Sequence, residues 1–390
     1  VKETRLNEAC RRILWVKKQL GILKSPIPDF DSYDKFASKE HKQIALNTAL
    51  ESITLLKNNS NLLPLKKEAN ILLCGPAANS LNIQNGAWTH TWQGVDTVYN
   101  TKGAKTFYEA IKDKSTGNVQ YSLGSNLDSA INISQTINKA KKSDVIVVCL
   151  GEIPCTEIPG NIEDLTLPAA QQELVTKLSK LNKPILFVLS FNRPRVINEI
   201  EPHATAILHT YLSGDFGGEA LAQILFGEKN PSGKLPFTYP RSTGSFVSYD
   251  HKYTEILDIN FGHNAFNPQW EFGYGLSYSK FNYKNLKLNK SEFNENDTIT
   301  LSIEVANSSE ITGKEVVQVF VSDSVASITP SVKRLRAFKK IELSGNETKI
   351  VEFNIPISEF SFIDATNKWK IEKGYFKVAI ANERQTLIVK

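Results

Sequence analysis

Two apolar stretches decide the fold: Val145-Ile146-Val147-Val148-Cys149-Leu150-Gly151 and Ile185-Leu186-Phe187-Val188-Leu189-Ser190. Neither alternates apolar with polar side chains, which is typical of strands that are covered on both faces of a parallel sheet. Comparable runs occur at residues 71–75 and 206–211. The intervening segments have helical periodicity around residues 104–112, 128–141, 169–181 and 218–226. This alternation predicts an α/β sandwich domain with a mainly parallel sheet over residues 38–240.

The residues before this domain predict two helices separated by a loop. Residues 1–23 have apolar side chains at three-to-four spacing and a glycine where a helix would end, which indicates one helix. Residues 24–37 contain prolines that resist helix formation and are expected to be a linker. A second helix is expected to begin near Ser38, with one face made of Ala45, Ala49, Ile53 and Leu56.

The hydrophobic pattern changes to a period of two toward the C-terminus. Residues 298–305 and 316–321 alternate apolar with polar side chains. Short strands separated by turn-forming residues predict an immunoglobulin-like β-sandwich across residues 279–390. Residues 241–278, rich in Tyr, Asn, Gly and Phe, are expected to be an irregular linker. Further strands are expected at 349–355, 368–372 and 375–381.

Composition excludes several classes of protein. The 390 residues include 41% hydrophobic and 22% charged side chains, which is ordinary for a folded chain and excludes wholesale disorder. No apolar run approaches the roughly 20 residues of a membrane helix, so no membrane span is expected. A net charge of +5 is too small and too mixed in sign to favour nucleic acid as a partner. The four cysteines lack zinc-ligand spacing: Cys10, Cys74, Cys149 and Cys155.

The segment after the first quoted strand is rich in acids. It runs from Gly151 to Pro168 and contains four carboxylates in a loop at the carboxyl end of a buried strand, where ligands bind in such sheets. Loop acids in this place are suited to proton transfer. They could equally be solvated loop charges, with one near a helix start for dipole reasons, and spacing alone favours that second interpretation. The four are Glu152, Glu157, Glu163 and Asp164.

A second loop, Asn85–Gly94, follows the strand at residues 71–75 and contains Trp88 and Trp92. Indole rings in a polar loop suit the flat faces of sugar rings, because an indole left in water gains nothing from its apolar area. The alternative is that one or both rings fill the core beneath the loop, and the sequence favours neither. His90 lies between them and is interpreted as a polar loop residue rather than a ligand.

Two further patterns carry little information. Gly214-Asp215-Phe216-Gly217-Gly218 lacks the Lys-Ser/Thr of a phosphate-binding loop, so we expect it to pack a helix start against the sheet. Ser190 is not in a Gly-x-Ser-x-Gly elbow, which argues against a serine hydrolase triad.

Several motifs together resemble the family 3 glycoside hydrolases, the β-glucosidase family. They occur in the family's order and extend nearly end to end, and the acid-rich loop belongs to them. The others are Glu51–Asn58 with Leu62–Leu65, Gly86–Thr89 with Trp92–Gly94, Asn230–Pro236, Phe272–Tyr278 and Glu315–Asp323.

This resemblance implies a particular domain order. In such enzymes a TIM-like barrel of ~250 residues comes first and supplies an aspartate nucleophile. An α/β sandwich domain follows and supplies the general acid/base, and a fibronectin type III-like domain ends the chain. Arg5–Leu14 resembles the final helix of that barrel, so residues 1–23 are expected to be its last helix, with the rest of the barrel missing.

The resemblance also implies roles for individual residues. Glu157, in Cys155-Thr156-Glu157, matches the general acid/base, with Glu152 as second and Glu163 as third candidate. Trp88 matches the aromatic side chain that stacks on the +1 sugar. A retaining mechanism needs two carboxyl groups ~5–5.5 Å apart, so Glu157 would have to be protonated when the substrate binds.

We therefore expect the C-terminal part of a retaining exo-acting β-glycosidase, most of all a β-glucosidase acting on terminal non-reducing β-D-glucosyl residues. This part alone is expected to be inactive. Its expected partners are a β-linked oligosaccharide or aryl glucoside and the barrel of the same protein, in a periplasmic or extracellular location. No cofactor and no metal is implied. The alternative is a non-catalytic carbohydrate-binding or scaffolding protein derived from the same family.

Overall fold

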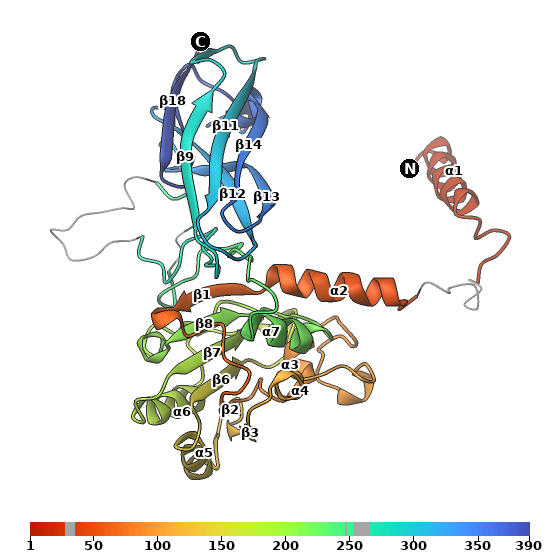
Figure 1. The fold of residues 1–390 in the computed structure, drawn as a ribbon. Helices are drawn as coiled ribbons and strands as arrows, with labels where there is room; N and C mark the ends of the chain where they lie inside the picture. The colour runs from red at the N-terminus through yellow and green to blue at the C-terminus, as the bar shows by residue number, and fades with distance from the viewer. Residues whose placement is uncertain (28–35, 246–247, 253–265) are drawn as a thin grey trace. The chain divides into compact units, whose positions relative to one another are not determined.

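The computed structural model describes residues 1–27, 36–245, 248–252 and 266–390. These residues form two compact units, 1–45 and 46–390, and each is described by itself (Figure 1). The expected linkers at 24–37 and 241–278 lie partly outside the described residues. The expected domain limits at 38–240 and 279–390 stay predictions. No described helix combines the length and the apolar character that crossing a membrane requires.

The first unit contains helix α1 (Glu3–Gln19), as its periodicity predicted. None of its residues is buried, although its sequence has an apolar stripe. Leu6, Ile13 and Trp15 on that helix are 54%, 58% and 59% exposed. The assignment of this helix to a barrel stays a prediction.

The second unit begins with a six-stranded sheet in the order β1-β8-β7-β6-β2-β3. All neighbouring strands are parallel except β1, which pairs antiparallel with β8, so the mainly parallel sheet is confirmed. The strands are β1 (Thr54–Asn58), β2 (Ile71–Cys74), β3 (Val119–Ser122), β6 (Val145–Gly151), β7 (Ile185–Ser190) and β8 (Ala206–His209). A short hairpin lies beside them, β4 (Gly124–Ser125) with β5 (Ala130–Ile131).

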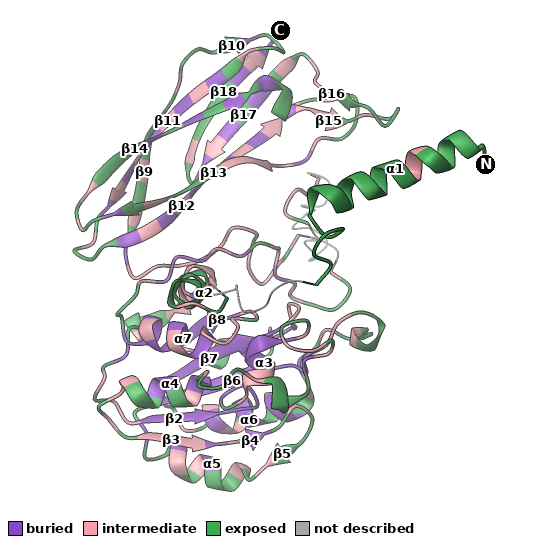
Figure 2. Cartoon of the chain, turned by 90° about the vertical axis from the view of Figure 1, so that its right-hand side faces the viewer, coloured by how far each residue is buried: buried purple, intermediate pink, exposed green. Residues whose placement is uncertain are grey.

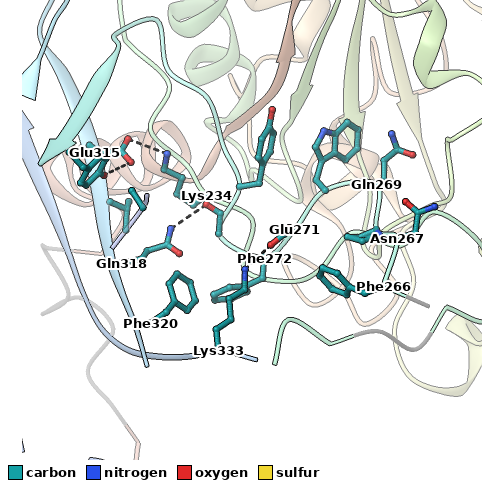
Figure 3. Close-up of a pocket in the computed structure, with 17 residues that line it drawn as sticks. Lys234, Phe266, Asn267, Gln269, Glu271, Phe272, Glu315, Gln318, Phe320 and Lys333 are labelled. Carbon is teal, nitrogen blue, oxygen red and sulfur yellow. Dashed lines mark hydrogen bonds and ion pairs between the residues drawn. The ribbon is translucent and has the colours of Figure 1, made fainter. Parts of the chain in front are cut away.

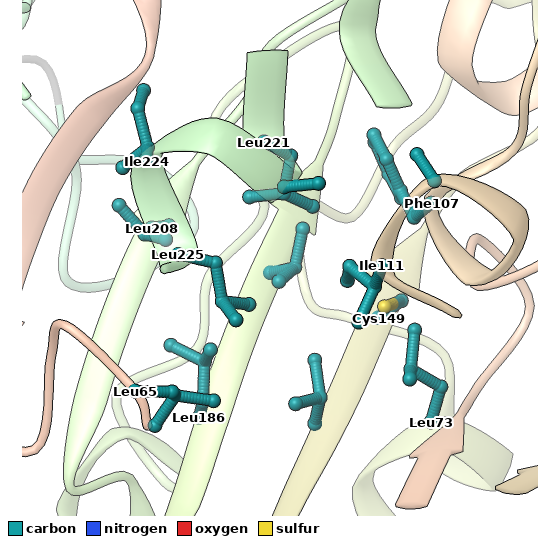
Figure 4. Packing of buried hydrophobic residues seen from close by; sticks show 14 of the residues in the cluster. Leu65, Leu73, Phe107, Ile111, Cys149, Leu186, Leu208, Leu221, Ile224 and Leu225 are labelled. Carbon is teal, nitrogen blue, oxygen red and sulfur yellow. The ribbon is translucent and has the colours of Figure 1, made fainter. Parts of the chain in front are cut away.

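Helices cover both faces of this sheet, which explains the continuous apolar runs (Figure 1). On one face Val147, Cys149 and Leu186 pack against α4 and α7 (Figure 4). On the other face Val148 and Phe187 pack against α5 and α6. The helices are α2 (Lys39–Ser52), α3 (Leu81–Asn85), α4 (Phe107–Lys114), α5 (Ile133–Ala140), α6 (Ala169–Ser179) and α7 (Gly217–Leu225).

Two helix predictions are wrong in their bounds. The helix expected to include Ile53 and Leu56 ends at Ser52, because the residues after it pair as β1 with the edge of the sheet. Ile53 and Leu56 are buried there in the core clusters on opposite faces of the sheet. The helix expected over 128–141 begins only at Ile133, because Asn132 has a left-handed backbone with φ of 49°.

The C-terminal part is a β-sandwich of two sheets, ordered β10-β18-β17-β12-β13 and β14-β11-β9, which confirms the predicted fold class. Apolar side chains from both sheets form one core. Figure 2 shows buried residues, in purple, on strands of both sheets. The sequence did not predict β9, β13 or β18. The strands are β9 (Phe281–Leu288), β10 (Glu292–Phe293), β11 (Thr298–Asn307), β12 (Gly313–Asp323), β13 (Arg334–Leu343), β14 (Thr348–Pro356), β15 (Phe362–Ile363), β16 (Trp369–Lys370), β17 (Gly374–Ile380) and β18 (Glu383–Val389).

Candidate functional site

Two loops meet beyond the carboxyl ends of β2 and β6. The acid-rich loop, Gly151–Pro168, follows β6, and the tryptophan loop, Asn85–Gly94, begins at the end of α3. The side chain of Gln93 joins them by reciprocal hydrogen bonds. Its Nε2 donates to the Thr156 carbonyl at 3.1 Å, and its Oε1 accepts from the Thr156 amide at 3.0 Å. The residue before Glu157 is thus fixed to the loop that carries Trp88.

Glu152 is held in the interior and is only 2% exposed. Its Oε1 accepts from the backbone amides of Asn192 and Arg193, at 2.7 and 3.0 Å. Its Oε2 accepts from Nε of Arg193 and of Arg195, at 3.0 and 2.8 Å. A carboxylate has about four acceptor positions, and four donors occupy them here. Glu152 therefore joins two segments of the chain, and its carboxyl group has no acceptor position left for a ligand.

Glu157 has the opposite environment, five residues further along the same loop. It is exposed, and its carboxylate has no hydrogen bond or ion pair within the described part of the chain. Its backbone has φ of 54° and ψ of −154°, a conformation that costs a residue with a side chain on the order of 1–3 kcal/mol. A strained backbone beside a fixed Thr156 places this carboxyl group on the surface, where it can meet a ligand.

The remaining two acids of the loop differ from each other. Glu163 is exposed. Asp164 anchors the end of the loop, because its Oδ1 accepts from the Thr166 amide and from the Thr243 hydroxyl, both at 2.8 Å. These hydrogen bonds, above all the one from the Thr166 backbone, lower the pKa of Asp164.

Neither tryptophan of the tryptophan loop fills the core. Trp88 is 65% exposed and Trp92 is 48% exposed, so the interpretation of these rings as core residues is wrong. The Trp88 backbone has φ of 60°, and its amide donates to the Thr91 carbonyl at 3.0 Å. Gly94 closes the loop so tightly that a Cβ there would lie 2.2 Å from the Gly86 carbonyl oxygen.

Asp215 holds the tryptophan loop from a third segment, the turn between β8 and α7. Its carboxylate accepts from Asn85 Nδ2 at 2.9 Å, contacts His90 Nε2 at 3.3 Å and accepts from the Thr101 hydroxyl. Asp215 was not among the predicted site residues, and the glycines around it were its only signal. His90 lies in this network, and its interpretation as a polar loop residue rather than a ligand stays a prediction. The two loops and this turn form one connected surface.

Comparisons with known proteins find matches for both parts of the second unit, the α/β domain and the β-sandwich. Residues 53–278 match the glycosyl hydrolase family 3 C-terminal domain, and residues 315–384 match a fibronectin type III-like domain. A β-glucosidase from Listeria innocua, solved with isofagomine, superposes with a TM-score of 0.90 at 29% identity. That match covers 100% of this chain and 56% of the other.

The sequence comparison with curated relatives also finds glycosidases. A lysosomal beta glucosidase of Dictyostelium discoideum is 36% identical over 98% of this chain and 49% of its own length. A periplasmic beta-glucosidase of Salmonella typhimurium is 32% identical, over 96% of this chain and 54% of its own. A beta-xylosidase of Formosa agariphila is 32% identical, over 96% and 53%. The chain thus spans about half the length of the curated relatives it matches.

Proposed function

The chain belongs to glycoside hydrolase family 3, and from that premise we propose that it is the C-terminal part of a retaining exo-acting β-glycosidase. The proposed substrates are oligosaccharides or aryl glucosides with a terminal non-reducing β-D-glucosyl residue. A barrel domain outside this sequence would supply the aspartate nucleophile. The names of the matching β-glucosidases support this substrate class. A periplasmic or extracellular location belongs to the proposal, supported by the periplasmic relative.

Glu157 is the proposed general acid/base, and the reciprocal hydrogen bonds between Gln93 and Thr156 are the observation that carries this assignment. They fix the residue before Glu157 to the loop of Trp88, so a proton donor and a stacking surface lie on one joined structure. Glu152 cannot serve, because its four acceptor positions are occupied. Glu163 has no comparable tie to the tryptophan loop among the described residues.

In the proposed reaction the barrel aspartate attacks the anomeric carbon while Glu157 protonates the glycosidic oxygen, so the bond to the leaving sugar breaks. Glu157, now a carboxylate, then removes a proton from water, which attacks the glycosyl-enzyme ester and regenerates both groups. The two carboxyl groups would need a separation of about 5–5.5 Å. Trp88 presents its exposed ring to the leaving sugar.

Helix α1 fits the same proposal. Its apolar side chains are exposed, and an apolar stripe of this kind ordinarily packs against another element. We place it on the barrel, as the last helix of that domain. On this view the chain alone lacks the nucleophile and has no glycosidase activity.

A non-catalytic carbohydrate-binding protein is the alternative, and the exposed Trp88 and Trp92 favour it because stacking on sugar requires no chemistry. Mixing this chain with a separately produced barrel half separates the two functions. Recovery of activity on an aryl β-glucoside supports the glycosidase, whereas sugar binding without any recovered turnover supports the alternative.

The experiment for Glu157 compares Glu157→Gln with Glu163→Gln in the complete protein. Glu157→Gln should lower kcat/KM on a substrate with a poor leaving group about 10²–10⁴-fold, since general acid catalysis contributes that much. A dinitrophenyl glucoside needs no proton for its departure, so its glycosylation step should be nearly unaffected, and azide should accelerate its turnover.

Glu163→Gln is the matched control, because Glu163 is an exposed glutamate of the same loop. It should retain full activity on both substrates. The assignment is wrong if Glu163→Gln abolishes turnover while Glu157→Gln leaves it intact.

A further inference from the structure

Two cavities of the second unit differ in how their charges are arranged. The first, of about 710 Å³, lies between residues 266–274 and β12 (Figure 3). Its charged side chains neutralise each other. Lys234 Nζ lies 3.1 Å from Glu315 Oε2, and Lys333 Nζ lies 2.6 Å from Glu271 Oε2. With its cations and anions paired, this cavity offers a charged ligand no complementary group.

The second cavity lies between the ends of β12 and β13 and the β15–β16 hairpin of the β-sandwich, with Lys252 from the segment before the sandwich also in its lining. Its volume is about 180 Å³. Its lining includes three of the exposed large apolar side chains of the sandwich. Trp369 is 68% exposed, Ile363 48% and Ile328 37%. The buried rings of Phe360 and Phe376 also line it. These side chains form an apolar recess for one small ring.

Cations dominate the charged lining of this second cavity. Lys252, Arg334 and Arg336 line it, against a single carboxylate, that of Asp323. Arg336 is the extra residue of a β-bulge, because Leu335 and Ala337 pair with the consecutive residues Phe320 and Val319. A bulge redirects the side chain that it carries, and bulges are enriched next to binding sites. Arg334 and Arg336 both line the cavity.

The existing contacts of the two arginines leave one donor of Arg336 without an acceptor among the described residues. Arg334 Nε lies 3.5 Å from Asp250 Oδ2, and Arg336 Nη2 donates to the Ser361 carbonyl at 3.1 Å. The buried Nε of Arg336 donates to no acceptor within the described residues. Burial, with a further contribution from the neighbouring Arg334, lowers the pKa of Arg336. An anion between the two guanidinium groups would relieve this repulsion.

We propose that this cavity binds a small carboxylate carried on a six-membered ring, either a uronic acid or an aryl carboxylate. The planar guanidinium of Arg334, with Arg336 beside it, suits the two oxygens of a carboxylate. The face of Trp369 suits either kind of ring. A volume of 180 Å³ lies below the ~300 Å³ of pockets for drug-sized ligands, so the site admits one ring rather than a chain of sugars.

Isothermal titration calorimetry on the 390-residue chain tests the proposal with five probes. Glucuronate and benzoate have the proposed chemistry, glucose and benzyl alcohol are their neutral counterparts, and inorganic phosphate has the charge without the ring. At least one carboxylate should bind, while its neutral counterpart should not. Tighter binding of glucuronate would identify the ligand as a uronic acid, and tighter binding of benzoate would identify it as an aryl carboxylate.

Variants locate the binding. Arg334→Gln should weaken it about tenfold or more, because a charge-assisted hydrogen bond is lost. Trp369→Ala should weaken it about three- to tenfold. Both side chains are accessible enough for folding to survive, which denaturant unfolding would verify. Arg384→Gln on β18 is the matched control and should leave the affinity unchanged.

Three results would each overturn the proposal. The first is no heat of binding for either carboxylate up to about 20 mM, a concentration that would detect a millimolar Kd. The second is phosphate binding as tightly as the ring carboxylates, which would mean that the apolar lining contributes nothing. The third is an affinity that Arg334→Gln does not change in a folded protein.

Discussion

The carboxyl end of the α/β sheet has two layers, a strand-end layer with Glu152 and His209 and a loop layer with Trp88 and Glu157. In the strand-end layer the polar side chains are nearly inaccessible, and the protein itself supplies the contacts of Glu152. In the loop layer the side chains of Trp88 and Glu157 are exposed, while Gln93 fixes the backbone of Thr156, the residue before Glu157. Residue type therefore says little about function here. The contacts around each carboxylate decide whether it stabilises the fold or is available to a substrate.

The most direct test of the difference between the two layers is to remove the charge of Glu152 and of Glu157 in turn. In the 390-residue chain, Glu152→Gln should lower the free energy of unfolding by about 3–5 kcal/mol, because the buried guanidinium of Arg195 and the partly buried one of Arg193 lose their anion. Glu157→Gln should change it by less than about 0.5 kcal/mol, as at other exposed positions. Denaturant unfolding measures both. Similar losses for the two variants would refute the division into layers.

The second expected effect concerns His209. Burial lowers the pKa of His209 to about 3, against an ordinary value of 6.5. The folded state therefore keeps His209 neutral while the unfolded chain binds a proton below pH 6.5, so stability falls as the pH falls through that window. Between pH 7 and pH 4.5 the loss should be about 2–3 kcal/mol.

Unfolding as a function of pH measures this loss, with His209→Phe as the test and the exposed His41→Asn as the control. His209→Phe should flatten the profile between pH 7 and pH 4.5, and His41→Asn should reproduce the wild-type curve. An unchanged slope in a folded His209→Phe variant would show that another group causes the pH dependence.

The third expected effect concerns the contact between the two loops of the loop layer. Gln93→Ala removes both hydrogen bonds to Thr156 and should weaken the contact between the loops by about 1–2 kcal/mol. Amide exchange at Thr156 should then accelerate roughly tenfold in the 390-residue chain. In the complete protein, kcat on substrates with poor leaving groups should fall, with a smaller change for activated ones.

Gln223→Ala is the matched control, since the Gln223 amide donates within α7 to Glu219. It should change neither exchange at Thr156 nor kcat. If Gln93→Ala leaves the exchange rate at Thr156 unaltered, the two loops are held together by something else.

The smallest effect belongs to Asp164. Hydrogen bonds from Thr166 and Thr243 lower its pKa below the ordinary 3.8, so the stability that Asp164 contributes is present above pH 3.8 and is lost as the pH falls through the folded-state pKa. Asp164→Asn should therefore lower Tm slightly at pH 7, and this difference should shrink as the pH falls below 3.8. A Tm difference that does not change as the pH falls would contradict this account.

The sequence predicts the sheet well because burial on both faces leaves a local signature. The runs at Val145–Gly151 and Ile185–Ser190 are continuously apolar, and both are strands. Ile53 and Leu56 could not be assigned in the same way. Their three-residue spacing fits a helix face, but the helix ends at Ser52, and Leu56 belongs to β1, which pairs with β8 some 150 residues away.

In the candidate site, too, only features with a local signal in the sequence could be predicted. The two loops were visible as unusual compositions, but the partners of Glu152 come from Arg193 and Arg195, about forty residues further along. No spacing within the acid-rich loop reveals them. Asp215 is more remote still, 130 residues after Asn85 of the tryptophan loop that it holds. The sequence also missed β13, because its Lys- and Arg-rich exposed face hides the alternation.

The paired hydrogen bonds between Gln93 and Thr156 have a consequence for anyone who exchanges loops among relatives of this protein. A side chain from the tryptophan loop holds both backbone groups of a residue in the acid-rich loop, so the course of each loop depends in part on the other. A graft of the acid-rich loop alone would leave Thr156 without Gln93 in the recipient. The transferable unit is the pair, and leaving-group preference and acid strength should move between proteins together.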